Sequence, residues 1–403
     1  MTTAARARAS SATLWTRIIS RRSRVSSSPR KRACTRSFAS TDFIRPHILE
    51  LAPYKPILPL DVLSGQLGIP VEQIIKLDAN ENPYGPPQEV FDALANLEFP
   101  HIYPDPESRR LREKLSFECG VPSENIIVGC GADELIDLIF RVVLEPGDCI
   151  INTPPTFGMY AFDCCVNAGQ IVDVPRGSAP TFKIDVEAIK AAVQENKPKM
   201  LFLTSPNNPD GTVIDEADID ELLKLPVLVV LDEAYIEFCE TQSRMQAVLE
   251  HDNLIVLRTF SKRAGLAGIR VGYAGMPLWI MTYMWRVKQP YNVSAVAEVA
   301  ACAALDNAEY LKKIKELLVR ERERLFSELL EFDSLTPYPS QSNFILIKVL
   351  GNAEDLKNYL AREGIMVRYY SSPPQLASCI RISVGKPEHT DSLIRALQRY
   401  YSM

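Results

Sequence analysis

The strongest constraint on the fold is an alternation of aliphatic runs and amphipathic segments between residues 125 and 260. The aliphatic runs occur in NIIVGCG, DCIINTP, QIVDVP, KMLFLTSP, VLVVLDEAY and LIVLRTF. Segments with helical periodicity, such as ADELIDLIFRVVL and VEAIKAAVQENK, lie between them. Continuous aliphatic strands separated by helices are typical of a mostly parallel sheet buried on both faces. We therefore predict an α/β fold in which helices sandwich that sheet.

The pattern changes after about residue 294. AEYLKKIKELLVRERERLFSELLEF reads as one long amphipathic helix, and we interpret its RERER run as a solvated face. SNFILIKV, GIMVRYY and CIRISVG then alternate with helical segments and predict a smaller α/β unit. We expect a large domain at residues 81–293 and a small C-terminal domain at 294–403. The proline-rich residues 42–80 should form an arm, with a short helix, that packs on the small domain.

The first 41 residues differ in composition from the rest. They hold nine arginines and one lysine but no acid, which leaves 45 − 10 = 35 basic and 50 acidic residues in the remaining chain. An Arg-rich, Ser-rich, acid-free start is typical of an organelle transit peptide. A basic arm that binds nucleic acid is the alternative, but the acidic body offers no second basic surface. We expect residues 1–41 to be a disordered transit peptide and the protein to bind no nucleic acid.

Two other classes of protein are disfavoured. No stretch approaches 18 consecutive apolar residues, so we expect no membrane-spanning helix. The nine cysteines form no CxxC pair and the four histidines are isolated from one another, so we expect no metal site.

Polar residues follow several of the aliphatic runs directly. They are GCGADE, SPNNPDG, DEAY and SKRAGLAGIR. Ligands of doubly wound sheets bind beyond the carboxyl ends of the strands, so these segments should share one site. The chain lacks the GxxxxGK[ST] of a P-loop ATPase, and GCGADE does not complete the GxGxxG of a dinucleotide site.

The residue types at this edge suit a phosphate. Ala132 and Asp133 open a helix directly after a glycine-rich turn, and backbone N–H groups at a helix start bind phosphate well. Ser261 and Arg270 supply a hydroxyl and a guanidinium to the same edge. Glycine-rich turns alone are weak evidence, so the case depends on what lies beside them.

The neighbouring residues suit an aromatic cofactor. Asp232 follows an aliphatic run, where it is either the partner of a protonated pyridine nitrogen or a helix N-cap or internal ion pair. Tyr235 and Asn208 can hydrogen-bond a phenolic oxygen, and Phe157 can stack on a ring. A lysine beside such groups, Lys262, completes the Schiff-base apparatus of pyridoxal 5′-phosphate (PLP).

The motifs NPxG, DxAY and SKxxxxxGxR, in that order, resemble the PLP-dependent aminotransferases of fold type I, class II. Within that family LDANENPYGPP, YPDPES, GADELIDL, PPTFGMY, SPNNPDG, DEAYIEF and RTFSKRAGLAGIRVGY resemble the histidinol-phosphate aminotransferases. The resemblance runs from about Phe43 to the C-terminus and is greatest to plant-type members, which carry targeting peptides. One departure is Asp210, where most relatives have threonine or a similar residue.

The resemblance implies roles for matching residues. Lys262 would bind PLP covalently and move the substrate proton, Asp232 would keep the ring nitrogen protonated, and Tyr235 and Asn208 would hold the ring oxygen. Phe157 would stack on the ring. The residues that would bind the phosphate are Ala132, Asp133, Ser261 and Arg270.

Other implied roles concern the substrate and a second subunit. Tyr103 would reach the phosphate from the neighbouring subunit of a homodimer. Arg381, with Arg368 as its helper, would bind the substrate anion. Asn80 and Tyr84 would line the substrate entrance.

The implied reaction is ping-pong transamination between L-histidinol phosphate and 2-oxoglutarate, which yields imidazole-acetol phosphate and L-glutamate in histidine biosynthesis. An aromatic amino-acid aminotransferase and a threonine-phosphate decarboxylase remain alternatives, because they share the cofactor residues. The implied location is the plastid stroma, with the mitochondrial matrix as the alternative.

Overall fold

The computed structural model describes residues 40–53 and 57–402. Most of the predicted transit peptide therefore lies outside the described residues. Residues 1–45 form a unit separate from residues 46–403, and Ser40–Phe43 in the first unit makes a single 3-10 turn. Within the described residues, no helix combines the length and the apolar character needed to cross a membrane.

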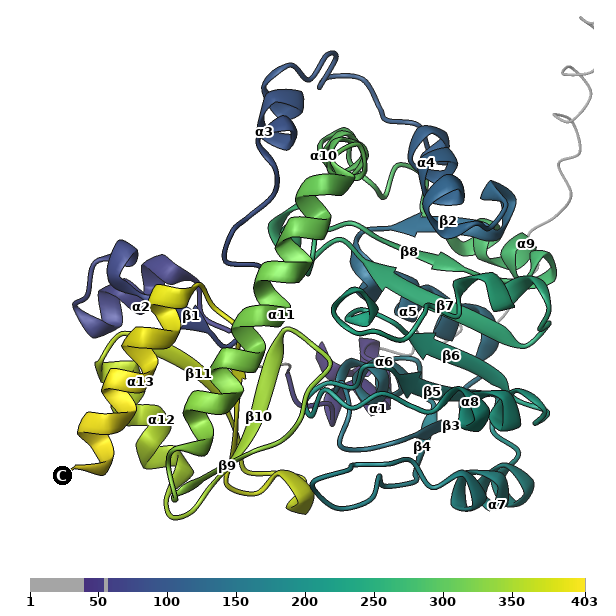
Figure 1. The fold of residues 1–403 in the computed structure, drawn as a ribbon. Coiled ribbons are helices and arrows are strands. Elements are labelled where there is room, and N and C mark those ends of the chain that lie inside the picture. The colour runs from purple at the N-terminus through teal and green to yellow at the C-terminus, as the bar shows by residue number, and fades with distance from the viewer. Residues whose placement is uncertain (1–39, 54–56, 403) are drawn as a thin grey trace, which may run out of the picture. The chain divides into compact units, whose positions relative to one another are not determined.

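A seven-stranded sheet forms the centre of the large domain (Figure 1). Every neighbouring pair is parallel except the two pairs that involve β8, so the predicted mostly parallel sheet is confirmed. The β8 strand, GYAG, was not predicted, because it contains no aliphatic run. In spatial order the strands are β2 (Ile126–Gly129), β8 (Gly272–Gly275), β7 (Leu254–Thr259), β6 (Leu228–Asp232), β5 (Met200–Thr204), β3 (Cys149–Asn152) and β4 (Gln170–Asp173).

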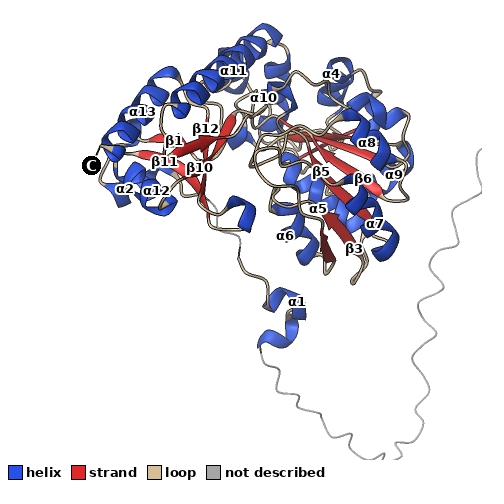
Figure 2. Cartoon of the chain, turned by 60° about the horizontal axis from the view of Figure 1, so that its bottom comes forward, coloured by secondary structure: helices blue, strands red, loops and turns tan. Residues whose placement is uncertain are grey.

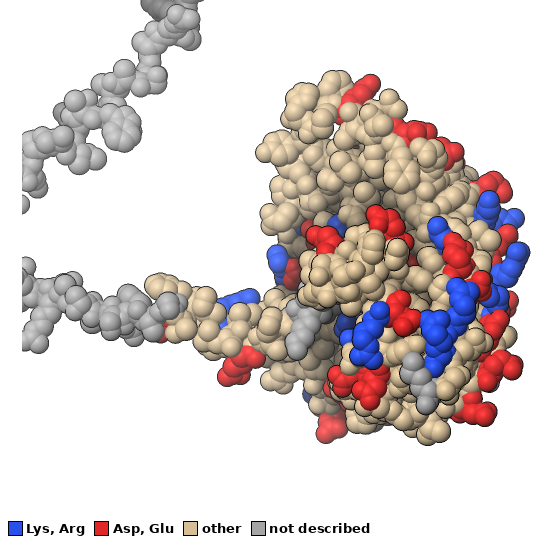
Figure 3. Space-filling model, turned by 90° about the vertical axis from the view of Figure 1, so that its left-hand side faces the viewer, with Lys and Arg blue, Asp and Glu red and all other residues tan. Residues whose placement is uncertain are grey.

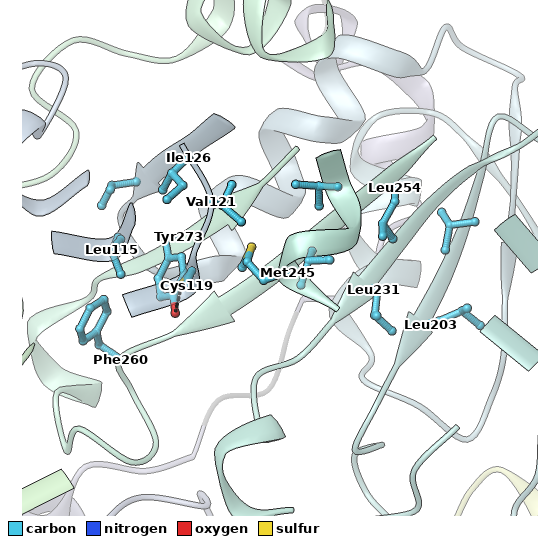
Figure 4. Packing of buried hydrophobic residues seen from close by; sticks show 14 of the residues in the cluster. Leu115, Cys119, Val121, Ile126, Leu203, Leu231, Met245, Leu254, Phe260 and Tyr273 are labelled. Carbon is cyan, nitrogen blue, oxygen red and sulfur yellow. Dashed lines mark hydrogen bonds between the residues drawn. The ribbon is translucent and has the colours of Figure 1, made fainter. Parts of the chain in front are cut away.

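Both faces of this sheet are covered, because alternate residues of each strand enter different hydrophobic clusters. Leu201 and Leu203 of β5 belong to one cluster, whereas Met200 and Phe202 belong to the other. Figure 4 shows side chains of the first cluster, including Leu203, along the sheet. The helices of the first face are α3 (Gln88–Ala95), α4 (Arg109–Cys119), α7 (Val186–Asn196), α8 (Glu216–Leu223) and α10 (Ala295–Leu305); those of the second are α5 (Gly131–Val143), α6 (Met159–Val166) and α9 (Leu278–Val287).

A second, five-stranded sheet forms the smaller α/β unit (Figure 2). Its first strand comes from the N-terminal segment and pairs in parallel with β11, whereas the other pairs are antiparallel. In order the strands are β1 (Ile75–Leu77), β11 (Ile365–Tyr370), β12 (Cys379–Ser383), β10 (Phe344–Val349) and β9 (Leu335–Pro337). The helices that pack with it are α11 (Ala308–Leu330), α12 (Ala353–Arg362) and α13 (Pro387–Tyr401).

Shorter elements complete the described chain. Two more helices precede β1, namely α1 (Pro46–Leu49) and α2 (Leu60–Leu67). Further 3-10 turns span Val71–Gln73, Ser123–Asn125, Ile236–Phe238, Met245–Leu249, Ala267–Ile269 and Pro374–Leu376.

The interpretation of RERER as a solvated face is wrong for two of its residues. Glu321 and Arg322 are buried, each with about one twentieth of its surface exposed (5%). The Arg322 guanidinium donates to the carbonyl oxygens of Phe238 and Ser342, at 3.3 and 3.1 Å. Position 322 continues the apolar spacing of α11, so it faces the interior, where backbone carbonyls of two other segments need a donor. Arg322 therefore connects α11 to both the large domain and the loop before β10.

The outer surface of the smaller unit carries mixed charge. In Figure 3, basic and acidic side chains are interspersed on the face shown. Ion pairs join its helices, as between Arg324 and Asp391 at 2.8 Å and between Arg399 and Glu363. Exposed pairs of this kind each contribute only about 0–1 kcal/mol, so the unit depends mainly on its apolar core.

Candidate functional site

A cavity of about 350 Å³ lies where β5, β6 and β7 end. The carboxyl ends of parallel strands meet at one edge of a sheet, which is why segments far apart in sequence converge there. The cavity brings together nine of the ten residues expected to bind the cofactor: Ala132, Asp133, Phe157, Asn208, Asp232, Tyr235, Ser261, Lys262 and Arg270.

One end of the cavity is built for an anion. Gly131 adopts φ +81°, and a Cβ there would lie 2.4 Å from Nη2 of Arg270, so glycine lets the guanidinium approach the first turn of α5. Arg270 donates to the carbonyl oxygen of Ala267 at 3.0 Å and to Oδ2 of Asp133 at 3.2 Å. Ser261 lies beside them at the end of β7. Backbone N–H groups of α5, a hydroxyl and a guanidinium form a phosphate-binding set.

Lys262 lines the cavity, three residues after β7 ends. Its Nζ atom donates to the carbonyl oxygen of Ala79 at 3.4 Å and lies 5.4 Å from the centre of the Tyr235 ring. No ion pair of Lys262 occurs among the residues that the structure describes. The amine is therefore held by weak contacts that a ligand can replace.

Asp232, the last residue of β6, is buried with 4% of its surface exposed. Its Oδ1 accepts from the backbone N–H of Ala234 at 2.9 Å, and its Oδ2 accepts from the hydroxyl of Tyr160 at 2.6 Å. Burial raises the pKa of Asp232 to about 6, against the lowering effect of these hydrogen bonds. Within the described chain it has no ion pair, so the alternative of an internal ion pair is not seen. A protonated pyridine nitrogen would supply the missing positive partner.

The segment Asp78–Asn80, which we call the strap, connects the two sheets through its backbone. The carbonyl oxygen of Asp78 accepts from Nη2 of Arg381 at 2.7 Å. The next carbonyl, of Ala79, accepts from Lys262. Arg381 belongs to the small sheet and Lys262 follows a strand of the large sheet. The strap therefore contacts two of the predicted cationic groups that a substrate would meet, Arg381 and Lys262.

Asn80 fixes the orientation of Tyr235. Its backbone N–H donates to Oγ of Ser383 at 2.8 Å, and its Oδ1 accepts from the same hydroxyl at 3.0 Å. Its Nδ2 must then be the atom that donates to the Tyr235 hydroxyl oxygen, at 3.0 Å. Asn343 donates to the Asn80 carbonyl at 3.0 Å. The Tyr235 oxygen already accepts a hydrogen bond, so its own proton is available to a ligand.

A second cavity, of about 400 Å³, adjoins the first through Lys262, Tyr235, Phe157 and Asn208. Its lining adds Arg368, Arg381 and Asn80, which neighbour one another in the small sheet and the strap. Nη1 of Arg381 donates to Oδ1 of Asn208 at 2.5 Å, while Nε of Arg381 is buried without a hydrogen-bond partner. Two guanidinium groups beside an amine make this a site for an anionic amino substrate.

Two predicted residues lie outside both cavities. Tyr103 is 78% exposed and stacks on Tyr291 with ring centres 4.5 Å apart. Tyr84 lies beneath Lys386, whose Nζ is 5.5 Å from the ring centre, and burial raises the pKa of Tyr84. The structure thus groups Asn80, but not Tyr84, with the two arginines.

Three hydroxyl groups that hydrogen bonds link to Asp232, directly or through one another, were missed. They belong to Tyr160, Thr204 and Thr156, and Thr204 also lines the first cavity. The available signal was position: Tyr160 and Thr156 both lie in PPTFGMY, and Thr204 is the last residue of β5. The pattern of aliphatic runs does not distinguish a threonine at a strand end from a turn residue.

Known proteins resemble this chain over most of its length. The family described as aminotransferase class I and II matches residues 72–397. A protein of Arabidopsis thaliana called histidinol-phosphate aminotransferase 1, chloroplastic, is 59% identical over 361 residues, which cover 89% of this chain and 86% of that protein. Histidinol-phosphate aminotransferase of Roseiflexus castenholzii is 48% identical over 367 residues, covering 89% and 98%.

The structure also resembles a solved one. The crystal structure of histidinol-phosphate aminotransferase from Sinorhizobium meliloti, in complex with pyridoxal-5′-phosphate, matches with a TM-score of 0.81 and 29% sequence identity. The match covers 90% of this chain and 97% of that one.

Proposed function

The chain belongs to the class I and II aminotransferases, which are PLP-dependent enzymes, and we propose that it transaminates L-histidinol phosphate with 2-oxoglutarate. The products are imidazole-acetol phosphate and L-glutamate, as a step of histidine biosynthesis. The 59% identity to a plant histidinol-phosphate aminotransferase, over 89% of the chain, is the observation that carries the proposal.

The residues of the first cavity fit PLP in size and chemistry. Ala132, Asp133, Ser261 and Arg270 would hold the phosphate, and Phe157 would stack on the ring. Asn208 uses its amide oxygen for Arg381, so its Nδ2 would donate to the ring oxygen. Tyr235 would donate to the same oxygen because Asn80 occupies its acceptor. When bound, PLP supplies the electron sink that stabilises the electron pair left by the broken Cα–H bond.

Two residues would carry out the proton chemistry. With PLP bound, Lys262 would remove the proton from the substrate Cα and would donate a proton at C4′. Its amine is suited to this movement because its only hydrogen bond among the described residues is the long one to Ala79. Asp232 stabilises positive charge at the ring nitrogen from a buried position, where the local dielectric makes the interaction strong.

The arginines must accept two different anions. L-Histidinol phosphate carries a phosphate and no α-carboxylate, whereas glutamate carries two carboxylates. We infer that Arg368 and Arg381 bind the phosphate in one half-reaction and a glutamate carboxylate in the other, since a guanidinium fork fits both anions. The buried, unpartnered Nε of Arg381 supports this role.

A homodimer would complete the site. Tyr103 is too exposed to serve its own subunit's cavity and lies next to Phe99 and Ile102, which are 60% and 57% exposed. We propose that this surface meets a second copy and that Tyr103 reaches the partner's phosphate site. The class I and II aminotransferases are generally dimeric, which supports the proposal.

The proposed location is the plastid stroma after removal of the transit peptide. The Arg-rich, acid-free first 41 residues and the chloroplastic names of the plant relatives support the plastid rather than the mitochondrial alternative. Import of residues 1–41 fused to a fluorescent protein would test it.

The first experiment is to record the visible spectrum of the purified holoenzyme and then add L-histidinol phosphate alone. Conversion of the yellow PLP form to the pyridoxamine form supports the proposed substrate. A spectrum that responds only to tyrosine or phenylalanine indicates an aromatic aminotransferase. Glutamate is the second addition, because a decarboxylase would not convert its cofactor with it.

A further inference from the structure

A continuous chain of hydrogen bonds connects Asp232 to Asn207 through Thr204, which lines the first cavity, and Thr156, which lines the second. The Tyr160 hydroxyl lies 2.6 Å from Oδ2 of Asp232 and 2.9 Å from Oγ1 of Thr204. Thr204 Oγ1 lies 3.1 Å from Oγ1 of Thr156, which lies 2.9 Å from Oδ1 of Asn207. Four hydrogen bonds therefore join a carboxylate to an amide oxygen through three hydroxyl groups.

The far end of this hydrogen-bond chain is Oδ1 of Asn207, which can only accept a hydrogen bond. Nδ2 of Asn207 donates to the carbonyl oxygen of Pro155 at 2.9 Å and to a carboxylate oxygen of Asp210. A flipped amide would place its oxygen against both of these acceptors, so Oδ1 must face Thr156. The carbonyl oxygen of Pro155 has no proton to donate, so this contact alone fixes the amide orientation. Asp210 lies on the same side, and its other oxygen, Oδ1, accepts from the backbone and hydroxyl of Thr212, at 2.8 and 2.5 Å.

The three hydroxyl groups have too few protons to form all four hydrogen bonds. Each hydroxyl supplies one proton, so Tyr160, Thr204 and Thr156 supply three protons for four hydrogen bonds. If Asp232 is ionised, both ends of the chain are acceptors and one contact has no proton. If Asp232 carries a proton on Oδ2, the proton directions run from Asp232 through Tyr160, Thr204 and Thr156 to Asn207, and every contact is satisfied.

We propose that, at mildly acidic pH, the hydroxyl chain holds a proton on Asp232 in the cofactor-free protein and that cofactor binding displaces it. A ring nitrogen that carries a proton needs the ionised carboxylate, so the proton on Oδ2 leaves to solvent and the Tyr160 hydroxyl turns to donate to Asp232. A ring nitrogen without a proton takes that same proton through its lone pair. In both cases one proton remains between the carboxylate and the ring.

Some of the charged groups around Asp232 raise its pKa and others lower it. Asp133 of α5 raises the pKa of Asp232, and Lys262 after β7 lowers it, while burial is the largest cause and raises it. The carboxyl of Glu233 is its neighbour in the chain, and its own pKa is raised by burial. Tyr160 on α6 is fully enclosed, so burial raises its pKa and it stays protonated. A hydrogen bond donated by Tyr160 lowers the pKa of Asp232, and the shortage of protons in the hydroxyl chain opposes that donation.

The inference rests on the proposed role of Asp232, and the test separates the two. The full-length enzyme is stripped of cofactor, and its Kd for pyridoxine 5′-phosphate, which has the ring and phosphate but no aldehyde, is measured from pH 5 to pH 8. Titrations of the ligand itself are common to all variants and cancel in the ratio of Kd values. Proton release is measured by calorimetry in two buffers of different ionisation enthalpy.

Thr204→Val is the decisive variant. Without the Thr204 hydroxyl, Tyr160 and Thr156 supply two protons for the two hydrogen bonds that remain. The chain then needs no proton from Asp232, so Asp232 ionises at lower pH. Below its pKa, a group that must lose a proton weakens binding about tenfold per pH unit. We therefore expect the wild-type Kd, relative to that of Thr204→Val, to rise about tenfold between pH 8 and pH 5. Thr204→Ser keeps the hydroxyl and should follow the wild type.

Thr156→Val is a second variant that tests the proposal independently of Thr204→Val. Thr156 does not touch Asp232, yet its loss also balances the proton count, so it should change the pH dependence in the same direction. Equal pH dependence in the wild type and both valine variants overturns the proposal. If Asp232→Asn binds the ligand as well as the wild type at pH 8, the proposed role of Asp232 itself fails.

Discussion

The two cavities that share Lys262 are built in different ways. The first is lined mainly by residues at or after the ends of strands in the mostly parallel sheet, together with Ala79 of the strap, so its position follows from the topology of that sheet. The second combines the small sheet, the large sheet and the strap, so its shape depends on how three separate segments pack. A parallel sheet therefore provides the cofactor chemistry, while specificity arises where independent segments meet.

The largest expected effect comes from Lys262, one of the residues that line both cavities. Lys262→Ala should lower kcat by on the order of 10⁴-fold, because no other described amine lines either cavity to move the proton. Steady-state kinetics and loss of the yellow Schiff-base absorbance measure it. Lys183→Ala, at a lysine whose side chain is 69% exposed, is the matched control. Substantial turnover by Lys262→Ala would remove it from the chemistry.

The connection between the two sheets is tested by Arg322→Met. The change leaves the buried carbonyl oxygens of Phe238 and Ser342 without their donor, at a cost of about 3–4 kcal/mol in the free energy of unfolding. Calorimetric unfolding of the holoenzyme should show the loss, with the visible spectrum unchanged. Arg320→Met, at an exposed position of the same run, should have little effect. Equal stability of the two variants would contradict the structural role of Arg322.

A test within the first cavity is the pH dependence of cofactor-free stability. The folded-state pKa of Asp232, about 6, exceeds its usual value of 3.8. Ionisation therefore costs stability as pH rises from about 4 to about 6, and the full cost of about 3 kcal/mol remains above that range. Asp232→Asn should stabilise the cofactor-free protein at pH 7 but not at pH 4. Thermal unfolding at both pH values checks this, and a gain that is the same at both would be inconsistent with it.

The second cavity is tested by Arg381→Lys, for which we expect the smallest effect. Lysine cannot make both hydrogen bonds to Asn208 and the Asp78 carbonyl, so kcat/KM should fall about 10- to 100-fold. Single-turnover measurements with L-histidinol phosphate and with glutamate should show losses of similar size. A loss confined to one half-reaction would mean that the two anions do not share this arginine. Arg362→Lys, on α12 outside both cavities, is the control.

The sequence predicts the first cavity well because strand ends can be read from aliphatic runs. Lys262, Asp232 and Arg270 each lie at or shortly after a predicted strand, and the topology brings them together. The sequence pattern does not reveal hydrogen-bond partners that belong to no recognisable motif. Backbone carbonyls of the strap are one case, and the hydroxyl of Thr204 is another.

The helical periodicity of α11 also indicated that Arg322 is buried, although its charge suggested exposure. Arg322 lies four residues after Leu318 and three before Leu325, so its position on α11 is that of a buried residue. Its charge led to the opposite interpretation, because a buried arginine needs acceptors that the helix itself cannot reveal. The roles of Tyr103 and Tyr84 depend on how surfaces meet, and the sequence does not encode that in any local pattern.

The strap has a consequence for protein engineering. It contributes mainly peptide groups to the contacts with Arg381, Lys262, Ser383 and Asn343, so these contacts fix its path. Ala79 lines both cavities, so the size of its side chain is constrained as well. A chimera that exchanges the C-terminal unit for that of another aminotransferase would therefore have to carry residues 78–80 with it, although more than 200 positions of chain separate them from Arg381 (303 between Asp78 and Arg381). The segments that must be exchanged together are neighbours in space, although they are far apart in the sequence.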